Sequence, residues 1–330
     1  YSIVQSQSEY TKGISPAKTR RSAHPDEVAQ PFEVLNHIST TQQTNWVAGQ
    51  TRPDLSCQIS FSQQIMPNPT VGQIRRSNAW VRRAKQFHEI SITYLSIPPD
   101  RLRFVCHSDY SSKDLDGTGR TQGGYIIGAT DPTMAKGLLA PWCPLVWTSQ
   151  QLKQGCTSTL AGESKLLKAS LGHLEWIMCS FAATLYPLFC LENRDVYSRK
   201  FSAISVIDCK SVFDHVTKPG ASTGLDDKKA SIDIAIAKTS LRRFGGTLRW
   251  GPTELMLGDA LTKDRAEAAD VLRACMRASA YQLADESVTL ARAQAEKLAR
   301  SSRAAALAPP PGLPHGGSRD DRHRGAGQGV

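Results

Sequence analysis

The sequence lacks a long apolar run and a paired-cysteine motif. The longest apolar stretch, 176–191, contains Pro187 and is short for a membrane span, so we expect no membrane partner. The eight cysteines are scattered without CxxC or CxxC…H spacing. This spacing disfavours a zinc site or a disulfide framework, and reduced intracellular thiols are the simpler interpretation. The opening is polar and starts at Tyr1, so we expect no signal peptide and a chain that is a fragment of a longer one.

Positive charge is the main compositional feature. The 330 residues carry a formal net charge of +10, with a pI of about 9.3. This balance fits a polyanionic partner, although solubility alone would also explain it. An expected helix at about 72–89 is dense in basic residues, which suits either a solvated face or a phosphate-facing surface. These residues are Arg75, Arg76, Arg82, Arg83 and Lys85.

Composition shifts along the chain predict five segments. The 40% hydrophobic content suffices for one large domain or two smaller ones. The first segment is polar and the last is rich in Pro, Gly and Arg, so neither is expected to bury a core. The predicted segments are 1–27, disordered or linker; 28–100, helical, with a break at Pro53; 101–266, α/β; 267–307, a helical extension; and 308–330, a disordered tail.

The central segment alternates apolar strands with helical patterns. Strands are expected near 102–108, 122–129, 143–149, 203–207 and 247–250, and helices near 158–182, 211–217 and 226–243. The first two strands flank a polar, Gly-containing loop and read as a hairpin. This order predicts an α/β fold with a five-stranded mixed sheet, three antiparallel strands first, flanked by helices and preceded by a small helical segment.

Four acids adjoin these elements. Asp109 ends the first strand, Asp208 ends the fourth, and the other two, Glu163 and Asp259, lie early in the long helix and just after the last strand. Strand ends and helix starts can converge on one edge of a sheet, which is the usual place for a site. Carboxylates share a small pocket only if cations neutralise them, and oxygen ligands favour Mg²⁺ or Mn²⁺. The competing interpretation is chance, because a chain with 30 acidic residues has many strand-end acids.

Five stretches resemble, in the same order, segments of copia-type retrotransposon Pol polyproteins. FVCHSDYS with GRTQGGYIIG is similar to the first catalytic strand and hairpin of that family's ribonuclease H. VWTSQQLKQGCTSTLAGESKLL resembles its catalytic-glutamate segment, with Glu163 in that place. VIDCKSVFD and LRWGPTELMLGDALTK resemble its third-acid strand end and closing segment. GQTRPDLSCQISFSQQIMPNPT is similar to the stretch between polymerase and ribonuclease H. Together these stretches cover about 45–265.

The resemblance implies a ribonuclease H-like fold behind a helical remnant of the reverse-transcriptase thumb or connection. The implied reaction is endonucleolytic cleavage of the RNA strand of an RNA–DNA hybrid, with two Mg²⁺ ions or Mn²⁺ in their place. Asp109 would bridge both ions, Glu163 and Asp208 would complete one site, and Asp259 would complete the other. The implied partners are the hybrid and the reverse transcriptase of the parent polyprotein, with no small-molecule cofactor. The implied location is cytoplasmic, with virus-like particles as one setting.

Candidate nucleic-acid contacts lie around these motifs. RNA specificity would come from 2′-hydroxyls in a wide, shallow minor groove, while basic, hydroxyl and amide groups contact the backbone. The basic residues could equally well lie on a solvent-exposed face without contacting nucleic acid. The candidates are Thr121, Gln122, Lys153, Lys165, Lys210 and Ser211, with Arg120 beside them.

The sequence also departs from the family pattern. Ala161 and Gly162 replace a Glu and an Ala, and Cys209 replaces an Asn. KKASIDIAIAKTS lacks both histidines of the corresponding family segment, and we interpret His173 and His215 as surface or packing residues. No Tyr-x-Asp-Asp motif appears, so the chain is not expected to polymerise DNA.

Two other classes of function remain open. One is a catalytically inactive relic that keeps the fold and binds nucleic acid. The other is a different nuclease of this fold, either an integrase or an exonuclease. The absence of a His/Cys zinc module argues against an integrase. An Asp-x-Glu pair on the first strand, expected of an exonuclease, is also missing, because Tyr110 and Ser111 follow Asp109.

Overall fold

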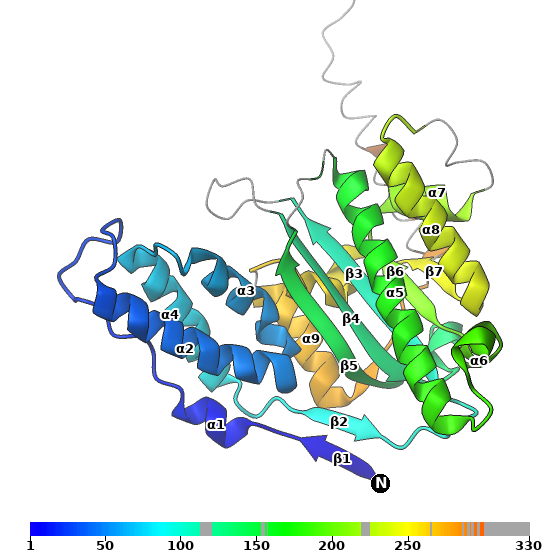
Figure 1. The fold of residues 1–330 in the computed structure, drawn as a ribbon, viewed down its shortest axis with the longest axis horizontal. Coiled ribbons are helices and arrows are strands. Elements are labelled where there is room, and N and C mark those ends of the chain that lie inside the picture. Colours follow the sequence, from blue (N-terminus) through cyan, green and yellow to red (C-terminus); the bar gives the residue numbers. More distant parts are fainter. Residues whose placement is uncertain are drawn as a thin grey trace, which may run out of the picture. The chain divides into compact units, whose positions relative to one another are not determined.

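A mixed β-sheet forms the centre of the structure, which is a computed structural model (Figure 1). It describes residues 1–112, 121–152, 156, 158–218, 225–264 and 266–285, with scattered residues between 287 and 299. Within the described residues the strand order is β7-β6-β3-β4-β5-β8. The strands are β3 (Arg103–Ser111), β4 (Gln122–Thr130), β5 (Ala140–Gln151), β6 (Ile204–Ile207), β7 (Thr247–Trp250) and the short β8 (Ala280–Tyr281).

Strand direction divides the sheet into two halves. The strands β3, β4 and β5 run antiparallel, while β6 and β7 run parallel to β3. A hairpin can join antiparallel strands, but parallel strands need a crossover, and α5 (Thr159–Leu185) lies in the connection between β5 and β6. The predicted α/β class with a mixed sheet, three antiparallel strands first, is therefore confirmed. The sixth strand, β8, was not predicted.

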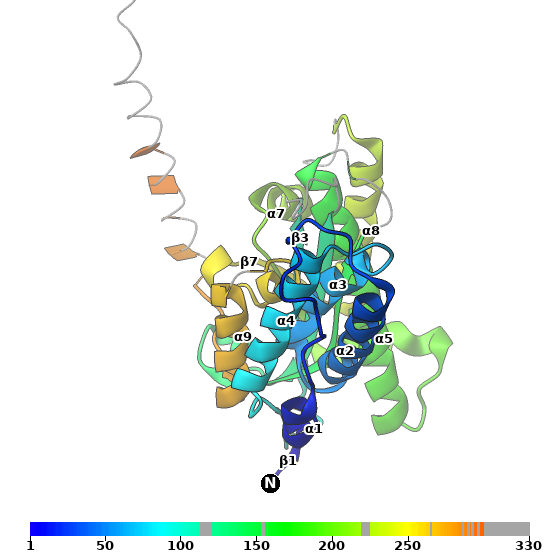
Figure 2. The same ribbon diagram turned by 90° about the vertical axis from the view of Figure 1, so that its left-hand side faces the viewer.

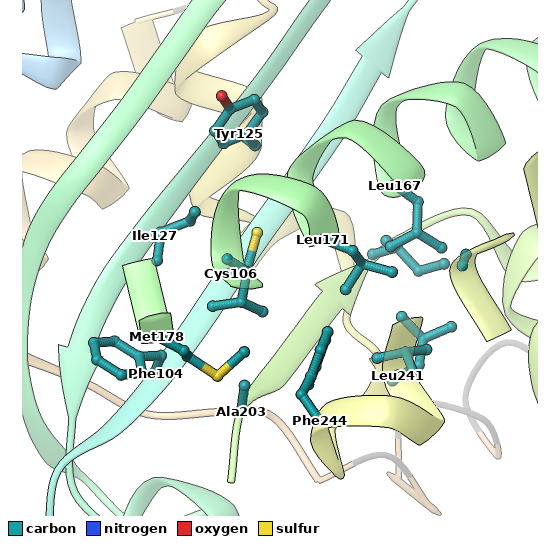
Figure 3. Packing of buried hydrophobic residues seen from close by; sticks show 14 of the residues in the cluster. Phe104, Cys106, Tyr125, Ile127, Leu167, Leu171, Met178, Ala203, Leu241 and Phe244 are labelled. Atoms are coloured by element: carbon teal, nitrogen blue, oxygen red, sulfur yellow. The ribbon is translucent and has the colours of Figure 1, made fainter. Parts of the chain in front are cut away.

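One face of the sheet is covered by α5 and α8 (Lys228–Phe244). Alternation along β3 directs Phe104 and Cys106 to this face, where they pack with Leu171 of α5 and Phe244 of α8 (Figure 3). The short helices α6 (Arg194–Ser198) and α7 (Lys210–Thr217) contact α5 and α8 on the same side. Burial of this apolar layer stabilises the sheet.

The opposite face is covered by residues 257–261, at the end of the predicted α/β segment, and by the helix that follows them. Val105 of β3 and Ile126 of β4 pack there against Leu257 and Leu261 of the 3₁₀ helix η6 (Leu257–Leu261) and against Leu272 of α9 (Ala266–Ala278). Within the predicted helical extension, α9 ends at Ala278 and β8 follows. A two-residue strand pairing with β5 carries too little sequence pattern to be predicted. The expected tail, 308–330, lies outside the described residues.

Three helices form the predicted helical segment: α2 (Pro31–Gln50), α3 (Ser56–Ile65) and α4 (Val71–Gln86), which face the viewer in Figure 2. The helix α4 starts with a capping box in which Thr70 and Gln73 bond each other's backbone. Val47, Ile59 and Val81 form part of a core between the helices. The Trp147 indole of β5 donates to the Ala48 carbonyl at 2.9 Å, so this segment is tied directly to the sheet. Residues 1–286 form one compact unit.

The first 27 residues differ from the expected disordered or linker stretch. They contain β1 (Ser2–Gln5), which pairs antiparallel with β2 (Ile92–Leu95), and α1 (Ser8–Gly13). Asn78 of α4 hydrogen-bonds both the backbone N–H and the carbonyl of Ala17, at 2.7 and 2.8 Å. Backbone pairing and polar side chains of a distant helix order this segment, and neither leaves an apolar pattern in the local sequence. Among the described residues, no helix is both long and apolar enough to span a membrane.

The basic residues of α4 hold the chain together internally. The Arg75 guanidinium donates to the carbonyls of Arg20, Arg21 and Ala23. Lys85 donates to the Ile14 carbonyl at 3.1 Å. These contacts add to the apolar packing of Ile14 and Ala17. Much of the positive charge predicted as a phosphate-facing surface therefore has a structural role.

Candidate active site

Two of the four acids meet because β3 and β6 are parallel neighbours. Val105 pairs with Ile204, and His107 pairs with Val206. Continuing this register places Asp208 beside Asp109, each at the carboxyl end of its strand. The Thr253 hydroxyl donates to Asp208 Oδ2 at 3.0 Å, and the Trp250 indole donates to the Asp208 carbonyl at 2.8 Å. Strand register thus delivers two carboxylates to one point, and neighbouring donors orient one of them.

Glu163 reaches the same point from the first turns of α5. Ser158 caps this helix, its hydroxyl accepting from the Ala161 N–H at 3.1 Å. The helix lies very close to β3, since a Cβ added to Gly162 would lie 2.4 Å from the Tyr110 ring. Gly162, which stands where the resembled family has Ala, therefore allows the approach that brings Glu163 inward.

Asp109, Glu163 and Asp208 form a cluster of carboxylates. Each offers one oxygen, and these oxygens all lie within 4.8 Å of one another. Asp109 and Glu163 are buried and Asp208 is half-buried. Such a set, with oxygen donors only, matches the ligands that Mg²⁺ and Mn²⁺ prefer.

The fourth acid, Asp259, lies on a segment that crosses the end of the sheet, which we call the closing strap (residues 256–264). The strap packs tightly, because a Cβ on Gly258 would lie 3.0 Å from the Asp109 Cβ. The Lys263 ammonium lies 2.7 Å from an Asp259 carboxylate oxygen and 3.6 Å from Asp109 Oδ2. The Thr262 hydroxyl donates to the same Asp109 oxygen. The strap thus supplies a carboxylate, an ammonium and a hydroxyl to the carboxylate cluster.

Burial and mutual repulsion shift the titration of this site. Burial, with Asp259 nearby, raises the pKa of Asp109 to about 7. Burial, with Asp109 and Asp208 nearby, raises the pKa of Glu163 to about 9. Burial works to lower the pKa of Lys263, but Asp109 and Asp259 outweigh it and raise that pKa. The site therefore favours protons or cations, and the residues present fit a divalent metal.

The residues predicted to contact nucleic acid differ from one another in burial and in their bonds within the protein. The Gln122 amide is buried and bonded to Ser60, Gln64 and Ser149, so its predicted substrate contact would break an internal network. Lys210 forms an ion pair with Asp214. For the remaining candidates, Thr121 and Lys165 are half-buried, Ser211 is exposed, and Lys153 and Arg120 lie outside the described residues.

Two residues of the site were missed at the sequence level. Thr262 and Lys263 lie within the stretch that resembles the family's closing segment. Lys263 follows Asp259 by four residues, and this spacing could have indicated an ion pair between them. His173 matches its interpretation as a surface or packing residue, because it is exposed, stacks on Tyr125 and hydrogen-bonds the Tyr125 hydroxyl at 2.8 Å.

Comparison with solved structures finds matches of low overall similarity. One similar solved structure is the N-terminal RNase H domain of a Mycobacterium tuberculosis protein, solved as a maltose-binding protein fusion. Another is RNase H1 from the archaeon Halobacterium salinarum. Each is 16% identical, with a TM-score of 0.32, and covers 51% of this chain and 96% or 98% of the solved chain. No protein-family model and no curated protein matches the sequence. The fold class therefore rests on the sheet topology, and the site rests on the geometry of this chain.

Proposed function

We propose that this chain is a metal-dependent ribonuclease H that hydrolyses the RNA strand of RNA–DNA hybrids endonucleolytically. The observation that carries the proposal is a carboxylate cluster: Asp109 and Asp208 at the ends of adjacent parallel strands, with Glu163 of α5, have oxygens within 4.8 Å of one another. The sequence resemblance to copia-type Pol polyproteins supports the same reaction. It also supports a parent polyprotein in which the reverse transcriptase is a partner.

The metal ligands follow from the donor set. Asp109, Glu163 and Asp208 would hold one Mg²⁺ ion, and Asp109 with Asp259 would contribute to a second, with Mn²⁺ able to substitute. Bound ions of this kind activate water and stabilise the leaving oxygen in phosphodiester hydrolysis.

The remaining residues of the site orient and balance these ligands. The Thr262 hydroxyl fixes the orientation of the Asp109 carboxylate, and Thr253 does the same for Asp208. Lys263 places a positive charge beside Asp109 and Asp259, which lowers the repulsion between them. This preorganisation means that the carboxylates need not rearrange before reaction.

Substrate recognition would combine charge with shape. The net charge of +10 favours a polyanion, and 2′-hydroxyls distinguish the RNA strand of a hybrid from DNA. Thr121, Lys165 and Ser211, with Lys210 if its pair with Asp214 opens, remain the proposed backbone contacts among the described residues. We propose no such contact for the Gln122 side chain, because its amide is used internally.

A cleavage assay tests the proposal. We expect the full chain with Mg²⁺ to cut the labelled RNA strand of a hybrid at internal positions, and EDTA to abolish cutting. DNA duplexes of the same sequence serve as the control and should stay intact. Tight hybrid binding without cleavage under Mg²⁺ or Mn²⁺ would refute the enzymatic proposal and favour the inactive nucleic-acid-binding relic.

A further inference from the structure

Two adjacent residues of the closing strap place their side chains in different parts of the molecule. Lys263 pairs with Asp259 and lies near Asp109. Asp264 instead accepts from Arg76 Nη2 of α4 at 3.1 Å and from the side chain of Trp80 on the same helix. Asp264, which follows Lys263 in the strap, is therefore held by helix α4 of the helical segment.

A second polar connection reaches the strap three residues earlier. The Ser149 hydroxyl of β5 donates to the Leu261 carbonyl at 2.6 Å. The Gln122 amide of β4 donates to Ser149 at 2.8 Å and to Ser60 of α3 at 2.9 Å. The Gln64 side chain of α3 donates to the side-chain oxygen Oε1 of Gln122 at 3.0 Å. The helical segment thus contacts the strap from α3, through the sheet, and from α4 directly.

We infer that Asp264 is a positioning residue, which α4 holds through Arg76 so that Lys263 and Asp259 stay against Asp109. This inference rests on the proposed function for its catalytic consequence. It makes the helical segment at about 28–100 a working part of the active site rather than an adjoining remnant.

The energetics separate positioning from folding. The Arg76 side chain is 44% exposed and that of Asp264 is 15% exposed. Partly exposed ion pairs contribute little to global stability, typically about 0–1 kcal/mol. Loss of this pair should therefore leave the fold intact and loosen the strap locally. Removing residues that orient metal ligands or their neighbours commonly costs about 10- to 100-fold in metal affinity or activity.

The test compares Asp264→Asn with Asp264→Glu and a matched control, Glu89→Gln, in the full chain. Glu89 pairs with Arg277 of α9 and so also links the helical segment to a later part of the chain, but its ion-pair partner lies outside the strap. We expect Asp264→Asn to lower kcat for hybrid cleavage about tenfold or more with KM nearly unchanged. We expect Asp264→Glu to restore most of the rate and Glu89→Gln to match the parent chain.

A double-mutant cycle identifies the route. If Asp264 acts through Lys263, then adding Asp264→Asn to Lys263→Met should cause no further loss of kcat. If Asp264→Asn lowers kcat by the same factor in the parent chain and in Lys263→Met, the inference is overturned. An unchanged kcat in Asp264→Asn alone would overturn it as well.

Hydrogen exchange separates this inference from the proposed function. Without turnover, Asp264→Asn should still speed deuterium uptake in residues 256–264, while Glu89→Gln should not. If the parent chain does not cleave hybrids, the proposed function fails, and strap exchange alone decides whether Asp264 holds the strap. If deuterium uptake in residues 256–264 is the same in Asp264→Asn as in the parent chain, the inference is overturned, whether or not the chain cleaves hybrids.

Discussion

Thr262 donates a hydrogen bond from its hydroxyl to Oδ2 of Asp109, across 153 positions of sequence. The bond joins the closing strap to the strand that begins the α/β segment, and it does so at the carboxylate shared by both proposed metal ions. Because hydroxyl donors stabilise the ionised form of a carboxylate, the bond partly offsets the effect of burial on Asp109. The geometry of the site therefore depends on how closely the strap packs.

Close packing of the strap gives a prediction for two glycines. A Cβ on Gly124 would lie 2.5 Å from the Leu261 Cβ and 3.0 Å from its carbonyl oxygen. Gly124→Ala should therefore displace the strap, lowering the free energy of unfolding by about 1–3 kcal/mol and slowing cleavage. Gly172→Ala is the control, because no atom lies within 4 Å of a Cβ there in α5.

The helical control should change stability in the opposite direction. Gly172→Ala should raise the free energy of unfolding by about 0.5–1 kcal/mol, since Ala has the higher helix propensity, without affecting cleavage. Urea unfolding of both variants measures the difference. Equal stability of the two alanine variants would contradict the close approach of the strap.

The Gln122 network gives a second prediction. Gln122→Ala removes a buried amide and leaves Ser60, Ser149 and Gln64 short of partners. We expect a loss of about 1–3 kcal/mol in the free energy of unfolding. Hybrid affinity, measured below the melting transition, should change little. A large loss of affinity in a stably folded variant would instead support the sequence-based role of Gln122 as a backbone contact.

The raised pKa values give a pH prediction for the metal-free chain. Asp109 and Glu163 titrate near 7 and 9 when folded but near 3.8 and 4.5 in the absence of the protein environment. Between these values the folded chain binds more protons than the unfolded chain, so stability falls as pH rises from about 4 to about 9. Thermal melts in EDTA should show this decline, and Glu163→Gln should flatten it.

Mg²⁺ should act in the opposite direction. Because it binds ionised carboxylates, the increase in Tm on adding Mg²⁺ should grow with pH over the same range. A metal-free Tm that rises steadily from pH 5 to pH 9 would contradict the buried carboxylate cluster.

The sequence predicted the sheet well because its strands are apolar and bounded by turns. Asp109 and Asp208 were predicted to meet because both end such strands, and parallel register does bring them together. The cluster with Glu163 was likewise expected from a helix start near the same edge.

Contacts without a local pattern could not be predicted. The ordered N-terminal segment depends on Asn78, 61 positions from Ala17, and Arg76 meets Asp264 over 188 positions. Gln122 looked available because it begins a strand beside a polar loop. Only the packing of α3 against the sheet shows that its amide is already used.

The most direct test of the account is a melt and a cleavage time course for Asp109→Asn, with Asp26→Asn as the control. Asp26 has a side chain that is 91% exposed and lies far from the site in sequence. An amide keeps the size of the carboxylate but is a poor Mg²⁺ ligand, so cleavage should fall by orders of magnitude. Removing one of several clustered charges should also hold or raise the metal-free Tm at pH 8. A folded Asp109→Asn variant that cleaves hybrids at the parental rate would contradict the metal-site account, and one that fails to fold would make Asp109 a structural residue.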